Sequence, residues 1–354
     1  MLVLAGDIGG TKTRLCVARV QPGAPGVAPR VTFGGSQRYD SRAHAGFEVV
    51  LRDFLAGLPA AERPRLAGFG IAGPVNDRRC RTTNLPWVVD ARDLEQGLGF
   101  AHVALANDFV ALARGIPAVE PALLATLHAG PREPLGPCAI LGAGTGLGEA
   151  ILVPVAGREP LVLATEGGHA TFAPRDELEG EVQRFLAARH GHVSWERLVC
   201  GEGLVNLVEA LSTALDLPIP ERIGTLLVRD RAAAPPQITA AARAGEPLCA
   251  RALQLFCSLY GAEAGNLALK CLPTGGVFVA GGIAPKLLPE LEDGRFAEGY
   301  LAKGRMRAVL AGFSVQVVLD EEVALRGAAL LAAGAATAVA GAATESVTES
   351  PLPA

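Results

Sequence analysis

Two segments of the chain follow the same pattern, and this repeat limits the possible folds more than any other feature of the sequence. LVLAGDIGGTKTRLCVARV at 2–20 and AILGAGTGLGEAILVPV at 139–155 each hold an apolar run, a turn rich in glycine and threonine, and a second apolar run. Short apolar runs bounded by glycines predict strands, so each segment predicts a β-hairpin. The chain is therefore expected to contain two related halves.

Strand and helix patterns alternate in both halves. Strands are predicted at 31–39, 66–72, 102–106, 277–280 and 314–319, and helices at 47–55, 179–189, 203–215, 223–231 and about 247–272. This alternation predicts an α/β fold in which helices pack against the sheets. The glycine- and proline-rich stretch at 115–137 predicts the connection between the halves.

Charge and composition argue against several kinds of partner. The net charge is −4 and basic residues do not cluster, which gives no support for binding to nucleic acid or to an anionic membrane. The uncharged run at 327–344 is nearly all alanine and glycine, too weakly apolar for a transmembrane helix, and the N-terminus lacks the regions of a signal peptide. The seven cysteines include no C-x-x-C pair, which favours small buried side chains in a reducing cytoplasm.

The first repeated turn has the residues of an anion-binding loop. Gly9 and Gly10 let backbone N–H groups approach a phosphate closely, and the hydroxyls of Thr11 and Thr13 add donors. Asp7 is suited to hold a hydrated Mg²⁺, which prefers carboxylate and phosphate oxygens. Taken alone, an ordinary tight hairpin explains this turn equally well.

The second repeated turn, at 142–148, holds four glycines in seven residues. Glycines weaken strands, so their presence favours the close approach of a ligand to the backbone. Two such turns facing each other would bind a polyphosphate from both halves. The predicted strand at 277–280 ends in Gly281 and Gly282, which fits close approach as well.

A third glycine motif does not predict a nucleotide site. The residues at 68–73 match G-x-G-x-x-G, but Pro74-Val75-Asn76-Asp77 follows and predicts a turn where a dinucleotide site needs a helix. The G-x-x-x-x-G-K-[ST] pattern of a P-loop is absent from the sequence. The turn after the motif therefore argues against NAD binding, and the missing pattern argues against a P-loop fold.

Asn107 and Asp108 follow a predicted strand, at the end where α/β sheets place their ligands. Asn107 offers an amide that both donates and accepts hydrogen bonds. Asp108 can accept a proton from a hydroxyl group or cap the next helix, and the local sequence favours the cap.

Three further polar side chains lie near turns of the second half. Glu166 and His169 share a glycine turn and are metal-ligand types, but no third ligand is evident. Glu196 also lies near a turn, where a solvated helix start is the simplest interpretation. His190 and His192 form a weaker metal candidate, because they lie in a polar loop with no evident partner.

Together these segments resemble the bacterial glucokinases of the sugar kinase–actin–heat-shock ATPase superfamily. The resemblance extends from Leu2 to about Ala333. It implies a two-domain ribonuclease-H-like (actin-like ATPase) fold with a ligand cleft between the domains. The segments that carry it are DIGGTKTRL (7–15), GIAGPV (70–75), TTNLPW (82–87), NDFVALARGIP (107–117), GAGTGLG (142–148), EGGHATFAP (166–174), GHVSWERLVCGEGLVNL (191–207), GNLAL (265–269) and GGVFVAGGI (275–283).

The expected division has a small α/β domain of residues 1–116 plus about 320–334 and a large α/β domain of residues 117–319. A last helix is predicted to end near Ala333. Residues 335–354, rich in alanine, threonine and serine, are predicted to form a disordered tail.

The resemblance also implies an activity, the transfer of the γ-phosphate of ATP to the 6-hydroxyl of glucose. Asp108 matches the base that takes the hydroxyl proton, and Asp7 lies near Mg²⁺. The residues expected to bind ATP are Gly9, Gly10, Thr11, Thr13, Gly144, Thr145, Gly146, Gly281 and Gly282. The residues expected at the sugar are Asn84, Asn107, Asp108, Glu166, His169 and Glu196.

Two departures and three alternatives complete the prediction. The stretch 170–199 has no cysteine, so the zinc of the related repressor/open-reading-frame/kinase group is not expected, and neither is the DNA-binding helix pair of its repressors. The alternatives are a kinase for another hexose, a non-catalytic sugar or nucleotide sensor, and an actin- or chaperone-like ATPase, which would not need the polyol-binding set. The family suggests a cytoplasmic homodimer.

Overall fold

The computed structural model describes residues 1–21, 23, 29–156 and 158–345, with residues 335–345 as backbone only. The chain divides into two compact units. Unit 1 consists of Met1–Glu120, Pro154–Leu163 and the chain from Asp320 onward, and unit 2 of Pro121–Val153 and Ala164–Leu319. Pro154–Leu163, predicted within the large domain, groups with unit 1.

Unit 1 is built on a five-stranded sheet of order β3-β2-β1-β4-β8. Its strands are β1 (Leu2–Ile8), β2 (Lys12–Gln21), β3 (Arg30–Asp40), β4 (Leu66–Ile71) and β8 (His102–Asn107). β1, β4 and β8 are parallel, and Asp7 pairs with Gly70, which in turn pairs with Ala106. The carboxyl ends of these three strands therefore meet at one edge of the sheet, where Asp7 and Asp108 lie.

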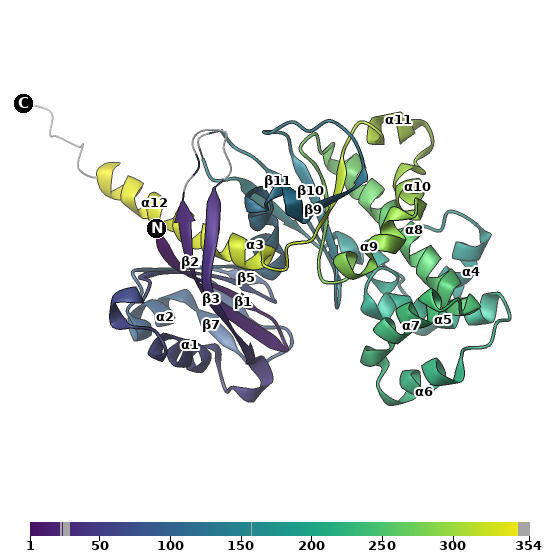
Figure 1. Ribbon diagram of the computed structural model, residues 1–354, viewed down its shortest axis with the longest axis horizontal. Helices are drawn as coiled ribbons and strands as arrows, with labels where there is room; N and C mark the ends of the chain where they lie inside the picture. Colours follow the sequence, from purple (N-terminus) through teal and green to yellow (C-terminus); the bar gives the residue numbers. More distant parts are fainter. Residues whose placement is uncertain (22, 24–28, 157, 346–354) are drawn as a thin grey trace, which may run out of the picture. The chain divides into compact units, whose positions relative to one another are not determined.

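Helices cover both faces of this sheet (Figure 1). α1 (Phe47–Ala56) and α2 (Ala91–Leu98) cover the face formed by Leu4 and Phe69, and α12 (Val323–Glu345) covers the face formed by Val3 and Ala5. Neighbouring residues of β1 thus point to opposite faces, as strand geometry requires. α3 (Asp108–Gly115) packs beside α12.

The first glycine of the G-x-G-x-x-G motif, Gly68, has a packing role. A Cβ at this position would clash with the carbonyl oxygen of Ala328, so the glycine allows α12 to pack closely on β4. α12 itself continues past Ala333, where it was predicted to end, to Glu345. Alanine has the highest helix propensity, which favours this extension. The rest of the predicted tail, residues 346–354, lies outside the described residues.

Unit 2 contains a six-stranded sheet of order β12-β11-β10-β13-β14-β9. Its strands are β9 (Leu124–His128), β10 (Cys138–Ala143), β11 (Leu147–Val153), β12 (Leu161–Thr165), β13 (Gly276–Ala280) and β14 (Val315–Val318). Of β12, the first three residues belong to the segment grouped with unit 1 and the last two belong to unit 2. Apart from β9, the order repeats that of unit 1, with an antiparallel hairpin beside two parallel strands. The predicted repeat and α/β fold are confirmed. β9, however, lies within the stretch predicted as a connection.

The helices of unit 2 surround α8 (Pro247–Cys271), which is buried along most of its length. Of the other helices, α4, α5 and α6 were predicted, whereas α7 and the short α9, α10 and α11 were missed. Their bounds are α4 (Glu177–His190), α5 (Gly201–Ala214), α6 (Glu221–Arg229), α7 (Ala234–Arg243), α9 (Leu288–Glu292), α10 (Arg295–Leu301) and α11 (Arg307–Leu310).

Three short strands, β5 (Val75–Asn76), β6 (Arg79–Arg81) and β7 (Val88–Asp90), form a small separate sheet in unit 1.

No helix within the described residues has both the length and the apolar character needed to cross a bilayer. All seven cysteines are free thiols; six are buried as predicted, and Cys271 is partly exposed.

Candidate active site

The turn between β1 and β2 is held by backbone and side-chain bonds within unit 1. The Gly9 N–H donates to the Lys12 carbonyl at 3.0 Å, and the Ser41 hydroxyl donates to the Gly9 carbonyl at 2.9 Å. Thr13 is fully buried, with its hydroxyl 3.0 Å from that of Ser41. The hydroxyl of Thr13, predicted as a phosphate donor, therefore packs inside the unit and fixes the turn.

Asn84 borders the same turn. A Cβ at Gly10 would lie 2.7 Å from the Cβ of Asn84, so only glycine fits there. The loop of Asn84 is closed by the Thr82 N–H, which donates to the Trp87 carbonyl at 3.1 Å. Both Asn84 and Thr11 are exposed. A predicted sugar residue thus lies next to the first predicted phosphate turn.

Asn107, rather than Asp108, is the N-cap of α3. Its Oδ1 accepts from the N–H of Phe109 at 2.9 Å, and its Nδ2 donates to the Gly73 carbonyl at 3.3 Å. Asp108 is the first residue of the helix and shares the Phe109 N–H, at 2.9 Å from its Oδ1. Its carboxylate therefore lies at the N-terminal, positive end of the α3 dipole.

The first hairpin carries an acid whose charge is disfavoured. Burial, and then the negative charge of Asp108, raise the pKa of Asp7 to about 6, while Arg14 opposes the shift. Asp7 also pairs with Arg14 across β1 and β2. A nearby cation would favour the ionised form of this carboxyl, and a carboxylate oxygen is a ligand that Mg²⁺ prefers. The donor chemistry at Asp7 therefore fits Mg²⁺.

The turn between β10 and β11 is fastened from two sides within unit 2. The Gly144 carbonyl accepts from the N–H of Gly201 at 2.9 Å, and the Leu147 N–H donates to Glu196 Oε2 at 2.9 Å. A Cβ at Gly146 would clash with the Glu196 carboxylate, so the glycine lets this carboxylate approach the turn closely. Thr145, at the tip, is exposed. Its hydroxyl remains open to a ligand.

Glu166, His169 and Glu196 come together in unit 2. The two ring nitrogens of His169 lie 3.9 Å from the carboxylates, Nε2 from Glu166 Oε2 and Nδ1 from Glu196 Oε1. The short helices η5 (Gly167–His169) and η6 (Trp195–Arg197) hold them, joined by the Trp195 N–H, which donates to the Ala170 carbonyl at 3.1 Å. The three side chains are 92%, 61% and 31% exposed, so they are open to a ligand.

Gly281 and Gly282 lie beside the second glycine turn. Gly281 has φ 83°, and a Cβ there would lie 2.6 Å from the Ala143 carbonyl oxygen, so its conformation and its surroundings both require glycine. The Ile283 N–H donates to the same carbonyl at 3.2 Å, and the buried Tyr260 hydroxyl accepts from the Ala143 N–H at 2.9 Å. Gly282 has open space where a Cβ would be. The two predicted nucleotide turns of unit 2 are therefore neighbours.

Sequence reasoning missed the residues that support these turns. Ser41 and Tyr260 gave no local signal, because their roles depend on contacts across the fold. Glu149 did give a local signal, since it is the only charged residue of strand β11. A charged residue in such a strand indicates a buried polar role.

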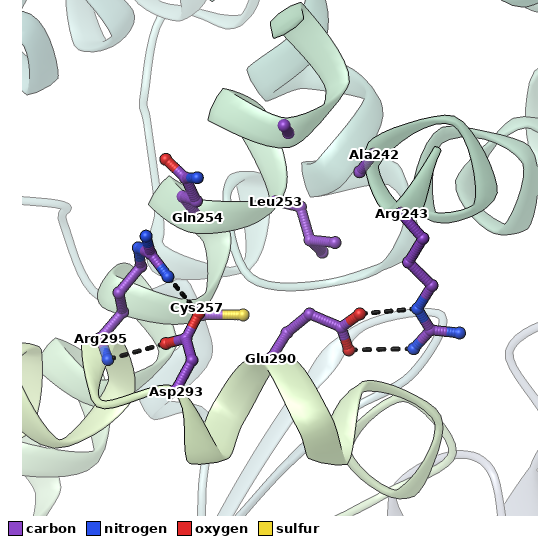
Figure 2. Close-up of a pocket in the computed structure, with 9 residues that line it drawn as sticks. Ala242, Arg243, Leu253, Gln254, Cys257, Glu290, Asp293 and Arg295 are labelled. Atoms are coloured by element: carbon purple, nitrogen blue, oxygen red, sulfur yellow. Dashed lines mark hydrogen bonds and ion pairs between the residues drawn. The ribbon is translucent and has the colours of Figure 1, made fainter. Parts of the chain in front are cut away.

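A hollow on unit 2 holds none of the predicted site residues (Figure 2). It measures about 130 Å³ and is lined by α7, α8 and the segment around α9. Its charged groups pair with one another, Arg243 with Glu290 at 2.6 Å and Arg295 with Asp293. Typical ligand pockets hold about 300–1,000 Å³. This hollow is therefore not the site.

Metal-ligating side chains do not gather in groups of three or more in the part of the chain that the structure describes. His192 Nε2 lies 3.1 Å from the hydroxyl of Thr171. The pair His190 and His192 thus gains no third ligand among those residues.

Solved structures define the class of the protein. The glucokinase from an Antarctic psychrotroph has a TM-score of 0.82 and 28% identity, covering 94% of this chain and 98% of that one. The ROK family glucokinase from Streptomyces griseus, solved in complex with glucose and AMPPNP, has a TM-score of 0.61 and 22% identity, covering 94% of this chain and 99% of that one, and shows the fold alone. The chain has the ribonuclease-H-like fold of the actin-like ATPases, in its sugar-kinase branch.

Sequence comparison then gives the family. The family model for glucokinase matches residues 4–335. The glucokinase of Synechocystis sp. is 41% identical to this chain, covering 93% of it and 97% of the Synechocystis protein. The chain belongs to the glucokinase family, as the resemblance of its motifs predicted.

Proposed function

We propose that this protein transfers the γ-phosphate of ATP to the 6-hydroxyl of glucose and releases glucose 6-phosphate and ADP. The observation that carries the proposal is the pair of acids at one edge of the unit 1 sheet. Asp7 is the last residue but one of β1, and Asp108 directly follows β8, the two parallel strands on either side of β4. The negative charge of Asp108 raises the pKa of Asp7. One acid is suited to a cation and the other to a hydroxyl proton, which are the two needs of phosphoryl transfer.

Glucose recognition is assigned to carboxylates and amides. Glu166 and Glu196 accept hydrogen bonds from sugar hydroxyls, and His169 donates or accepts according to its protonation. Asn84 adds an amide, and the remaining Nδ2 hydrogen of Asn107 adds a donor while Oδ1 keeps the helix capped. Support comes from the exposure of Glu166 and His169 and from the His169 ring, which lies 3.9 Å from the carboxylates of both Glu166 and Glu196.

ATP binding is assigned to the glycine turns. Gly10 and Thr11 offer backbone and hydroxyl donors to the phosphates from unit 1, and Gly9, whose N–H donates to Lys12, lets the phosphates approach the backbone. In unit 2 the phosphate residues are Gly144, Thr145 and Gly146, and the adenosine residues are Gly281 and Gly282. Backbone N–H groups in such turns bind anions without a charged side chain. Thr13 acts through the shape of its turn.

Asp108 accepts the proton of the 6-hydroxyl as that oxygen attacks the γ-phosphorus. Positioning and charge stabilisation dominate phosphoryl transfer, so the residues that fix glucose and ATP contribute most of the rate. Asp7 would hold Mg²⁺, which would supply positive charge near the phosphates. We further propose a cytoplasmic homodimer without structural zinc that supplies glucose 6-phosphate to glycolysis.

The test is ADP release from MgATP with and without a panel of hexoses. Glucose-dependent release is expected, and Asp108→Asn should lower kcat about 10²- to 10⁴-fold while glucose still binds. Asp93→Asn, an exposed acid in the first turn of α2, is the matched control and should retain wild-type kcat.

Other outcomes separate the alternatives. Release without any sugar would indicate an ATPase, and glucose binding without release would indicate a sensor. ADP release with another hexose, and none with glucose, would indicate a kinase for that other sugar. Each of these results contradicts the proposal.

A further inference from the structure

A second pair of acids lies in unit 2, among residues that the proposed reaction does not use. Glu149 on β11 is 2% exposed and Glu263 on α8 is 0% exposed. Their carboxyl groups are close enough for the charge of one to affect the pKa of the other. No hydrogen-bond donor in the described part of the chain reaches Glu149 Oε1, Glu149 Oε2 or Glu263 Oε1. If both groups were ionised, these three buried oxygens would have no donor at all.

With one proton between them, the two carboxyl groups carry a single negative charge, which the positive charge of Lys270 balances. Lys270 Nζ lies 4.0 Å from Glu263 Oε1, and Asn266 Nδ2 donates to Glu263 Oε2 at 2.7 Å. Lys303, which follows α10, donates to the Asn266 amide oxygen. The titratable and charged groups on the elements around the pair are Tyr260 and Lys270 of α8, Lys303, Arg175, Glu179 of α4, and Glu166 and His169 of the turn beside β11.

Glu149 also touches the turn that carries Glu166 and His169. A Cβ at Gly167 would clash with Glu149 Oε2, so the carboxyl group lies directly against the Gly167 backbone. A Cβ at Gly168 would clash with the carbonyl of Leu147, two residues earlier on the same strand. The turn therefore rests on β11, and Glu149 is part of the surface that supports it.

We propose that Glu149 and Glu263 share one proton and that the protonated pair is a positioning device, which holds the turn of Glu166 and His169 in its glucose-binding form. This inference rests on the proposed binding of glucose by that turn. Loss of the proton leaves two buried negative charges that repel each other, and the group free to move is the carboxylate against Gly167. Glucose affinity then falls.

The direction of titration agrees with this geometry. Burial raises the pKa of Glu263 to about 8, with the charge of Glu149 as the next cause. Burial raises the pKa of Glu149 as well, and Lys270 opposes the shift. The shared proton is therefore expected to be present at neutral pH and to leave in mildly alkaline solution.

The test is the pH dependence of kcat and of KM for glucose in the full-length protein. Between about pH 6 and about pH 9, KM of the wild type is expected to rise about tenfold while kcat changes little, because one charged hydrogen bond to the sugar is weakened. Glu149→Gln replaces the shared proton with amide hydrogens that do not titrate. Its KM should stay near the low-pH wild-type value across the range.

Two further variants keep the test decisive. Glu263→Gln should flatten the profile in the same way and serves if Glu149→Gln does not fold. Glu221→Gln removes an exposed acid at the start of α6 and should keep the wild-type rise. His169 remains in all three variants, so a rise caused by its titration would persist in Glu149→Gln.

The overturning results are specific. A wild-type rise of KM that persists in both glutamine variants of the pair would overturn the shared proton, as would a flat wild-type profile. A KM that follows sodium or potassium concentration at fixed pH would show that a cation joins the carboxyls. Failure of the wild type to phosphorylate glucose at any pH would instead refute the proposed function. The infrared band of a protonated carboxyl, present in the wild type and lost in Glu149→Gln, would then still support the shared proton, and its absence would overturn it.

Discussion

The hairpin of β1 and β2 and the hairpin of β10 and β11 open two sheets of the same strand order, yet each carries its acid in a different place. In the first hairpin Asp7 lies on the leading strand, opposite Arg14, and is partly exposed. In the second, Glu149 lies on the returning strand, opposite Leu141, and is almost fully buried. Each acid has a second acid as its neighbour.

The difference shows that the repeated backbone motif determines where the strands end, whereas the solvent exposure of each acid determines what chemistry it can perform. An acid at the accessible edge can meet a cation or a substrate hydroxyl, as we propose for Asp7 and Asp108. An acid sealed under a turn can exchange only a proton, as we propose for Glu149 and Glu263. The first pair is therefore expected to affect kcat, and the second to affect KM and stability.

The largest expected effect separates the two hairpins directly. Asp7→Asn should lower kcat about 10²- to 10³-fold, the loss typical when one group that stabilises transition-state charge is removed. Glu149→Gln should change kcat at neutral pH by less than a few-fold. Steady-state kinetics at saturating glucose and MgATP measure both. Equal losses of kcat in the two variants would remove the distinction between the hairpins.

A second prediction tests the contact between Glu149 and the glucose turn. Gly167→Ala places a methyl group against the Glu149 carboxylate and should raise KM for glucose about 10- to 100-fold by displacing the turn. In Glu149→Ala the carboxylate is absent, so adding Gly167→Ala to that variant should cost much less. The measurement is a double-mutant cycle on kcat/KM for glucose. Additive effects would show that the carboxylate does not press on the turn.

A third prediction concerns stability against pH. The folded protein holds the Glu263 proton up to about pH 8, whereas the unfolded chain releases it near the ordinary value of 4.5. The contribution to stability is therefore complete below about pH 4.5 and is lost as pH rises toward about 8, by on the order of a few kcal/mol. Glu263→Gln should remove this slope in urea unfolding followed at several pH values. Glu221→Gln should run parallel to the wild type, and a wild-type slope unchanged by Glu263→Gln would contradict the assignment.

Much of the fold could be predicted because the two hairpins are local. Each consists of two apolar runs and a glycine turn within about twenty residues, and period and turn chemistry predict such units well. β9 was missed because it depends on pairing with β14, which follows it by nearly two hundred residues. Nothing local distinguishes such an edge strand from a connection.

The candidate site was predicted at the level of turns and not of their supports. Glu166, His169 and Glu196, which the family resemblance assigned to the sugar, come together in unit 2, and their binding of glucose stays a prediction. The cap of α3 went to Asn107 instead of Asp108, because two adjacent side chains compete for the same N–H and sequence spacing does not decide between them. Burial was equally invisible, and it separates Thr13, which is buried on β2, from Thr145, which is exposed at the tip of the second turn.

The smallest expected effect tests this last contrast between the hairpins. Thr13→Val removes the hydroxyl that faces Ser41 in the interior and should cost about 1 kcal/mol of unfolding free energy. Thr145→Val changes an exposed hydroxyl and should leave stability within about 0.5 kcal/mol. KM for ATP should respond in the opposite order, rising in Thr145→Val and changing little in Thr13→Val, because only the exposed hydroxyl can reach a phosphate. Urea unfolding and ATP titrations on both variants measure the contrast. A larger rise of KM for ATP in Thr13→Val would mean that its hydroxyl leaves Ser41 for the nucleotide, and the two turns would then be equivalent.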